Sequence, residues 1–148
     1  MLSVFLTCAL LIFLYAAVWY GIALYKQRND VADIAWGLGY VFICIYLFLF
    51  QSKAPISVLL YTLVIIWGLR LSIHIYTRNK GKTEDLRYKQ WREEWGKTFY
   101  WRSFLQVFLL QGVILLIIIS PIILSSTVLD QNYSLATIIG IVLWTVGF

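Results

Sequence analysis

The chain has 148 residues, of which 61% are apolar and only 13% are Asp, Glu, Lys or Arg. A soluble domain of this length usually carries about 25% charged residues, so the composition excludes a folded surface that faces water on all sides. The net charge of +5 does not indicate nucleic-acid binding, because most basic residues lie in one loop between hydrophobic segments, as in membrane proteins.

Four segments are long and apolar enough to cross a bilayer as helices. A helix needs about 20 residues to cross a hydrocarbon core of roughly 30 Å. The segments that meet this requirement are residues 2–25, 31–50, 56–76 and 104–129, and residues 133–148 begin a fifth span. We therefore expect an all-α fold, a polytopic transmembrane helical bundle that forms one transmembrane domain over residues 1–148.

The last two spans carry features that modify this expectation. Pro121 lies inside the fourth span and should kink it unless neighbouring groups satisfy the carbonyl that proline leaves free. The fifth segment supplies a helix of only roughly 24 Å and stops without a basic anchor. A terminal carboxylate near the hydrocarbon is costly, so we expect the chain to be the N-terminal part of a longer protein.

Two cysteines, Cys8 and Cys44, lie inside apolar runs. Neither forms a CxxC motif, and neither has a histidine beside it. We expect both to be buried packing residues, and we expect no metal site.

The positions of lysine and arginine predict the orientation of the chain. Two basic residues, Lys26 and Arg28, follow the first span, and Lys53 lies in the second connection. The third connection, residues 77–102, holds eight more: Arg78, Lys80, Lys82, Arg87, Lys89, Arg92, Lys97 and Arg102. Because cytoplasmic loops are rich in Lys and Arg, the N-terminus should lie outside and the basic loop in the cytoplasm, in a bacterial inner membrane.

The basic loop should contain a short amphipathic helix at the level of the headgroups. Thr83 is a suitable N-cap, and Gly96 a suitable C-terminal stop. Tyr88, Trp91 and Trp95 are spaced so that they share one face. Such a helix is either an interfacial anchor without chemistry or a lid over a pocket that opens toward the cytoplasm.

Polar residues form stripes on the second and third spans. The second-span stripe includes Asp33, Trp36, Gly37, Tyr40 and Cys44, and the third-span stripe includes Trp67, Arg70, His74 and Arg78. Both stripes place ionisable groups near the same end, so their depths should match. Because charged groups inside spans normally face each other or a wet cavity, we expect Asp33 to pair with Arg70 or His74.

Several spaced motifs resemble an uncharacterised membrane family related to the steroid 5α-reductases. The resemblance covers roughly residues 30–121, in the right order. It rests on Asp33-Ile34-Ala35-Trp36-Gly37, Trp67-Gly68-Leu69-Arg70-Leu71, Arg78, Glu84-Asp85-Leu86-Arg87-Tyr88 and Gln111-Gly112.

The resemblance implies a membrane-embedded, NADPH-dependent reductase. Such an enzyme reduces a carbon–carbon double bond conjugated to a carbonyl in a steroid-like or other lipid substrate. The family's strongest cofactor motif, an Arg-His-Pro-x-Tyr-like segment, does not occur in these residues. The resemblance therefore implies an N-terminal reductase fragment that is inactive alone.

The resemblance also implies roles for individual residues. Asp33 and Trp67 fall at pocket positions where the relatives carry a carboxylate and a tyrosine, so these two are the catalytic candidates. Because indole cannot act as an acid, the tryptophan leaves the proton donor open. The candidate NADPH contacts are Arg70, Arg78 and Arg87, and the candidate substrate-pocket residues are Trp36, Tyr40 and His74.

Two alternatives stay open. A lipid or isoprenylcysteine methyltransferase would bind S-adenosylmethionine in place of NADPH. A non-enzymatic membrane subunit or transporter piece would use Asp33 and Arg70 only to hold helices together. In each case the expected partners are membrane lipid and, for the enzymes, a lipid-like small molecule rather than nucleic acid.

Overall fold

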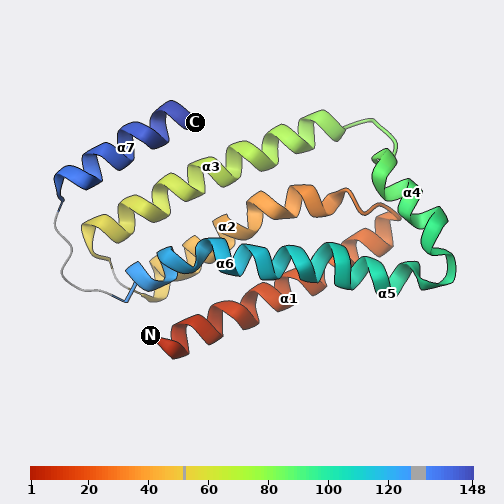
Figure 1. Cartoon of the computed structure of the whole chain (residues 1–148), viewed down its shortest axis with the longest axis horizontal. Helices are drawn as coiled ribbons and strands as arrows, with labels where there is room; N and C mark the ends of the chain where they lie inside the picture. The colour runs from red at the N-terminus through yellow and green to blue at the C-terminus, as the bar shows by residue number, and fades with distance from the viewer. Residues whose placement is uncertain (52, 128–132) are drawn as a thin grey trace.

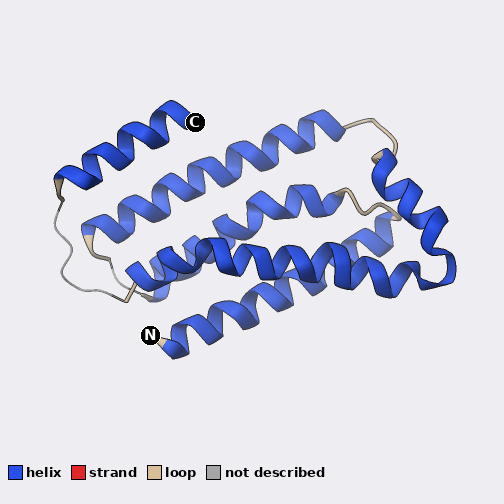
Figure 2. Ribbon diagram, in the orientation of Figure 1, coloured by secondary structure: helices blue, strands red, loops and turns tan. Residues whose placement is uncertain are grey.

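The computed structural model describes residues 1–51, 53–127 and 133–148, and it is built of helices joined by short connections (Figures 1 and 2). No strand occurs in these three ranges. The helices are α1 Leu2–Lys26, α2 Val31–Phe50, α3 Pro55–Asn79, α4 Leu86–Trp95, α5 Phe99–Ser103, α6 Leu110–Ser125 and α7 Leu135–Gly147. A 3₁₀ turn (Gly96–Thr98) joins α4 to α5, and a π-helical segment (Phe104–Leu109) joins α5 to α6.

The predicted membrane-spanning helices are present. Four helical stretches are long and apolar enough to cross a membrane: Leu2–Lys26, Val31–Phe50, Pro55–Asn79, and the consecutive helical segments of Leu86–Ser125. The fold class is therefore a helical bundle of the transmembrane type, as the composition predicts. The predicted boundaries differ by a few residues, and positions 128–129 of the fourth predicted span lie outside the described residues.

One end of the bundle gathers the basic connections. The C-terminal end of α1, the N-terminal end of α2, the C-terminal end of α3 and all of α4 lie at the right-hand side of Figure 1. We call this the basic end, because it carries Lys26, Arg28, Arg78 and Lys80. The side of the membrane on which it lies stays a prediction.

Local chemistry explains where several helices start and stop. Pro55 occupies the first turn of α3, where its missing N–H would have no partner in any case. The Asp85 side chain accepts the Arg87 backbone N–H at 3.0 Å and caps α4, so the expected Thr83 cap is wrong. Gly96 ends α4 with a φ of 44°, which favours glycine.

Helices α2 and α3 approach each other more closely than ordinary side chains allow. A Cβ on Gly68 would lie 2.7 Å from the Gly37 carbonyl oxygen, and a Cβ on Gly37 would overlap Ser72. The Ser72 hydroxyl in turn donates to the Ile34 carbonyl at 3.0 Å. Helix contacts in membranes typically have small residues, which let the two backbones approach, and hydroxyl groups that form hydrogen bonds between the helices.

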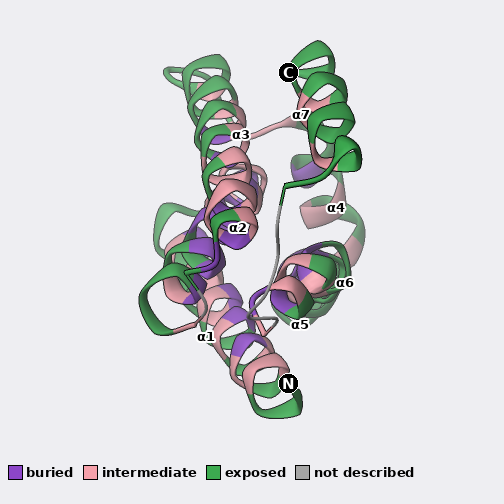
Figure 3. Ribbon diagram, turned by 90° about the vertical axis from the view of Figure 1, so that its left-hand side faces the viewer, coloured by how far each residue is buried: buried purple, intermediate pink, exposed green. Residues whose placement is uncertain are grey.

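Buried residues lie on the faces that the helices turn toward one another (Figure 3), and the buried hydrophobic residues form two clusters. The first lies between α1, α2, α3 and α6 and contains both cysteines, each with 0% exposure, as expected. The second lies at the basic end, where Tyr88, Trp91 and Trp95 of α4 face α1, α2 and the start of the fourth span. The three aromatic residues therefore share one face of α4, as predicted, and this face points inward.

Helix α6 continues through Pro121 to Ser125. Proline cannot donate to the Ile117 carbonyl four residues earlier. The Ser120 hydroxyl donates to that carbonyl at 2.7 Å. The carbonyl that Pro121 frees is thus satisfied within the helix. A sharp kink at Pro121 is therefore not required.

Candidate functional site

A groove of about 530 Å³ opens between α2, α3, α4 and α6 at the basic end. Its apolar wall includes Trp36, Leu71, Ile75 and Ile114. Its polar lining consists of Asp33, His74, Arg78, Arg87 and Gln111. Apolar walls with a few convergent polar groups are typical of small-molecule sites.

Asp33 is the only carboxylate among the described residues that line this groove. The Tyr88 hydroxyl donates to Asp33 Oδ1 at 2.8 Å, and Arg87 Nη2 lies 3.5 Å from Asp33 Oδ2. Asp33 sits in the first turn of α2, where the helix dipole also favours a negative charge. Its partners come from α4, so the predicted pairing with Arg70 or His74 is wrong.

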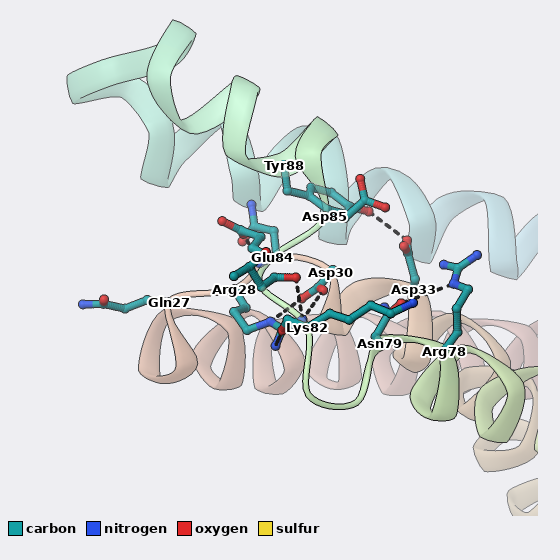
Figure 4. A network of polar contacts seen from close by, with 12 residues as sticks. Gln27, Arg28, Asp30, Asp33, Arg78, Asn79, Lys82, Glu84, Asp85 and Tyr88 are labelled. Atoms are coloured by element: carbon teal, nitrogen blue, oxygen red, sulfur yellow. Dashed lines mark hydrogen bonds and ion pairs between the residues drawn. The ribbon is translucent and has the colours of Figure 1, made fainter.

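Helix α4 is fixed over this end of the bundle by a polar network (Figure 4). Glu84 Oε1 accepts the Asn29 backbone N–H at 2.6 Å, and its carboxylate also pairs with Arg92 at 3.1 Å. Arg92 donates to the Gln27 carbonyl at 3.0 Å. The connection between α1 and α2 and the segment that starts α4 therefore hold each other in place.

A second part of the network ties the α3–α4 connection to the α1–α2 connection. Arg28 binds Asp30 with two hydrogen bonds of 2.6 and 3.0 Å, and it donates to the Lys82 carbonyl at 2.8 Å. The Asn29 amide donates to the Ser103 hydroxyl at 2.7 Å. Asn29 and Asp30 are almost completely buried. Buried polar groups that have hydrogen-bond partners make the local structure rigid and favour a single conformation of the chain.

The electrostatic environment of α4 keeps its cap ionised. Hydrogen bonds from the Arg87 side chain and backbone N–H hold the pKa of the Asp85 carboxyl below its ordinary value. An ionised cap suits the positive end of the α4 dipole. Arg87 is thus shared between the cap of α4 and the carboxylate of the groove.

The cationic side of the groove is formed by α3 and α4. Arg78 donates through Nε to the Asn79 side chain at 3.2 Å. Its terminal nitrogens have no hydrogen bond or ion pair to any residue that the structure describes. Arg78 and the exposed His74 are one turn apart on α3 and both face the groove, so this wall can receive an anionic group.

Five of the eight residues predicted for the site line the groove together: Asp33, Trp36, His74, Arg78 and Arg87. Tyr40 and Trp67 lie behind Trp36, in edge-to-face contacts with centroid distances of 5.4 Å (Trp36–Tyr40) and 5.3 Å (Tyr40–Trp67). Arg70 lies outside the groove, with its guanidinium 4.5 Å from the centre of the Phe148 ring. The functional roles of all eight stay predictions.

Two site residues were not predicted as such. The sequence places Tyr88 on an aromatic face and in one motif of the resemblance, without a role in the site, yet its hydroxyl donates to Asp33. Gln111 belongs to a motif of the resemblance and is expected to bond across helices without a function of its own, yet it lines the groove. A glutamine inside an apolar span is the signal that could have identified Gln111, because polar residues in spans usually face the interior of the bundle.

The fold and the site define a polytopic, membrane-type helical bundle with a polar groove at one end. The chain belongs to the family described as "Protein of unknown function (DUF1295)", which it matches over residues 19–148. No curated protein and no solved structure matches the chain significantly.

Proposed function

We propose that this protein is part of a membrane-embedded, NADPH-dependent reductase. Its substrate is a lipid-like molecule with a carbon–carbon double bond conjugated to a carbonyl. The observation that carries the proposal is the groove, which combines an apolar wall, two arginines and one carboxylate near the end of a span. The resemblance to relatives of the steroid 5α-reductases supplies the class of reaction.

The cationic wall fits the phosphates of NADPH. The terminal nitrogens of Arg78 have no hydrogen bond or ion pair to the described residues, and Arg87 reaches the groove from α4. A planar guanidinium can bind two phosphate oxygens at once, which suits a diphosphate or a ribose phosphate. When bound, NADPH would supply a hydride to the β-carbon of the double bond.

The residues of the groove would supply the proton. Reduction of a conjugated double bond adds one hydride to the β-carbon and one proton to the α-carbon. Among the groove-lining groups of the described chain, the His74 imidazole can donate a proton and the Asp33 carboxylate can hold a proton donor in place. In this proposal His74 donates the proton, and Tyr88 positions Asp33 through its hydroxyl.

The apolar wall would hold the lipid-like part of the substrate. Trp36, Leu71 and Ile114 come from three different helices and face the same space. Trp67 contacts Tyr40, which contacts Trp36. We therefore assign Trp67 the role of supporting the substrate wall from behind, rather than contact with the reacting carbonyl.

Binding of NADPH to the purified protein in lipid nanodiscs tests the proposal. Energy transfer from the seven tryptophans to the nicotinamide ring gives a dissociation constant without a known substrate. Arg78→Ala should weaken NADPH binding by about 10- to 100-fold, because a hydrogen bond to a charged group contributes about 1.5–3 kcal/mol. Arg102→Ala, an exposed arginine outside the groove, is the matched control and should bind like the wild type.

Two other outcomes would contradict the proposal and favour one of the alternative functions. Binding of S-adenosylmethionine that depends on Arg78, with no binding of NADPH, would favour the methyltransferase. Unchanged NADPH binding in Arg78→Ala, or none in any variant, would favour a non-enzymatic role. In that case the contacts of Asp33 with Tyr88 and Arg87 only hold α4 on the bundle.

A further inference from the structure

A second cavity at the basic end, of about 220 Å³, lies between α1, α2 and α3. Its lining includes Lys26, Arg28, Asp30, Tyr76, Asn79 and Lys80. It shares no lining residue with the groove described above. On α2 the cavity uses Val31 and Ile34, whereas the groove uses Asp33 and Trp36, so the two sites lie on different faces of that helix.

The charges around this cavity are unbalanced. The Asp30 carboxylate is buried and fully engaged by Arg28, which also donates to the loop that starts α4. Lys26 and Lys80 are exposed, and neither ammonium has a carboxylate within ion-pair distance among the residues that the structure describes. Two positive charges therefore face the cavity without a partner in the described chain.

An unsatisfied donor lies beside these lysines. Asn79 Oδ1 accepts a hydrogen bond from Arg78, but the buried Asn79 Nδ2 has no acceptor in the described structure. Buried donors nearly always have a partner, so this amide is suited to donate to an oxygen atom of a bound molecule. Figure 4 shows Asn79 at the edge of the polar network, with Asp30 and Lys82 nearby.

The depth of the cavity indicates the source of that oxygen. It lies where α1 ends and α3 leaves the apolar part of its span. Tyr25 is 90% exposed and Tyr76 is 54% exposed, and exposed tyrosines at the end of a span are typical of the headgroup region. Basic pockets between spanning helices at this depth bind anionic lipid headgroups.

We infer that this cavity binds the phosphate of an anionic phospholipid headgroup through Lys26, Lys80 and Asn79. The phosphate diester supplies the negative charge that the two lysines lack and an acceptor for the asparagine amide. The acyl chains then lie along the exposed outer surface of α1 and α3. The inference is independent of the chemistry of the groove.

Lipid binding measured by native mass spectrometry tests the inference. The probes are phosphatidylglycerol and phosphatidylcholine, added to the detergent-solubilised full chain. The wild type should prefer phosphatidylglycerol, and Lys26→Gln with Lys80→Gln should weaken its binding by about 10- to 30-fold, since each basic residue near a membrane surface contributes roughly fivefold. Phosphatidylcholine binding should change little.

Matched variants distinguish binding at a specific site from a general attraction of anionic lipid to the positive charge of the basic end. The double variant Lys89→Gln with Lys97→Gln removes the same charge from exposed positions on the α4 side of the basic end. This variant should still prefer phosphatidylglycerol to phosphatidylcholine. The double variant Lys26→Arg with Lys80→Arg keeps both positive charges and should bind phosphatidylglycerol like the wild type. Equal loss in both glutamine pairs, or no loss in either, would overturn the inference. Binding of inorganic phosphate at the same lysines without a preference for phosphatidylglycerol would also overturn the lipid assignment.

Discussion

An ionised carboxylate near the end of a spanning helix is costly unless donors surround it. Asp33 has two donors, the Tyr88 hydroxyl at 2.8 Å and the Arg87 guanidinium at 3.5 Å. Tyr88 is only 4% exposed, so water cannot easily replace its hydroxyl. The Tyr88 contact therefore matters for both the position of Asp33 and the position of α4.

Tyr88→Phe should lower the free energy of unfolding by about 1–2 kcal/mol, because it leaves a partly buried carboxylate with one donor fewer. Unfolding by SDS titration in mixed micelles measures this change. Tyr100→Phe, which removes a hydroxyl from a 62% exposed ring, is the control. Equal stability of the two variants would mean that the Tyr88–Asp33 hydrogen bond contributes nothing.

Local patterns in the sequence predict only some of the residues that form the groove and their contacts. Asp33 and His74 were expected at one depth, and both line the groove because helical spacing and span ends fix depth well. The partner of Asp33 was not predictable in this way. Tyr88 lies 55 residues along the chain from Asp33, and a contact over that separation depends on how α4 folds back, which no local pattern encodes.

At the scale of elements, the close contact between α2 and α3 holds together the two helices that carry Asp33 and His74. Gly68→Ala should lower the free energy of unfolding by about 1–3 kcal/mol, because its methyl group would meet the Gly37 backbone oxygen and push the helices apart. Gly21→Ala is the matched control, since nothing lies within 4 Å of the added Cβ. SDS titration compares them. A Gly68→Ala protein as stable as Gly21→Ala would contradict the close approach.

Helix α4 depends on Glu84, which binds both the Asn29 backbone and Arg92. Glu84→Gln should speed hydrogen exchange of the α4 amides by about tenfold or more, since hydrogen bonds to charged groups contribute about 1.5–3 kcal/mol. Exchange followed by mass spectrometry resolves α4 from the spans. Glu93→Gln, at an exposed position on α4 itself, should leave exchange unchanged. Equal rates in both variants would show that Glu84 does not anchor α4.

The elements themselves were largely predictable, whereas their exact ends were not. Apolar length identified the spans, because a bilayer demands about 20 apolar residues per helix. Capping propensity alone predicts that α4 starts at Thr83. Asp85 caps it instead, because Arg87 supports that carboxylate and Glu84 is already bound to Asn29.

At the scale of the whole molecule, the grouping of basic residues predicts the topology. A membrane-impermeant maleimide added to intact cells should label Lys53→Cys and should not label Lys97→Cys, because the basic loop is expected in the cytoplasm. The native cysteines are fully buried and give little background. Labelling of Lys97→Cys alone would reverse the orientation, although the arrangement of the helices would stand.

We propose that the groove between α2, α3, α4 and α6 binds NADPH. Ile75 lines this groove, whereas Thr77, two residues along α3, is exposed outside it. The measurement is the rate of maleimide labelling of Ile75→Cys and Thr77→Cys in nanodiscs, with and without NADPH. At tenfold its dissociation constant, NADPH should slow labelling of Ile75→Cys by about tenfold and leave Thr77→Cys unchanged. Labelling of Ile75→Cys at the same rate with and without saturating NADPH would contradict the account.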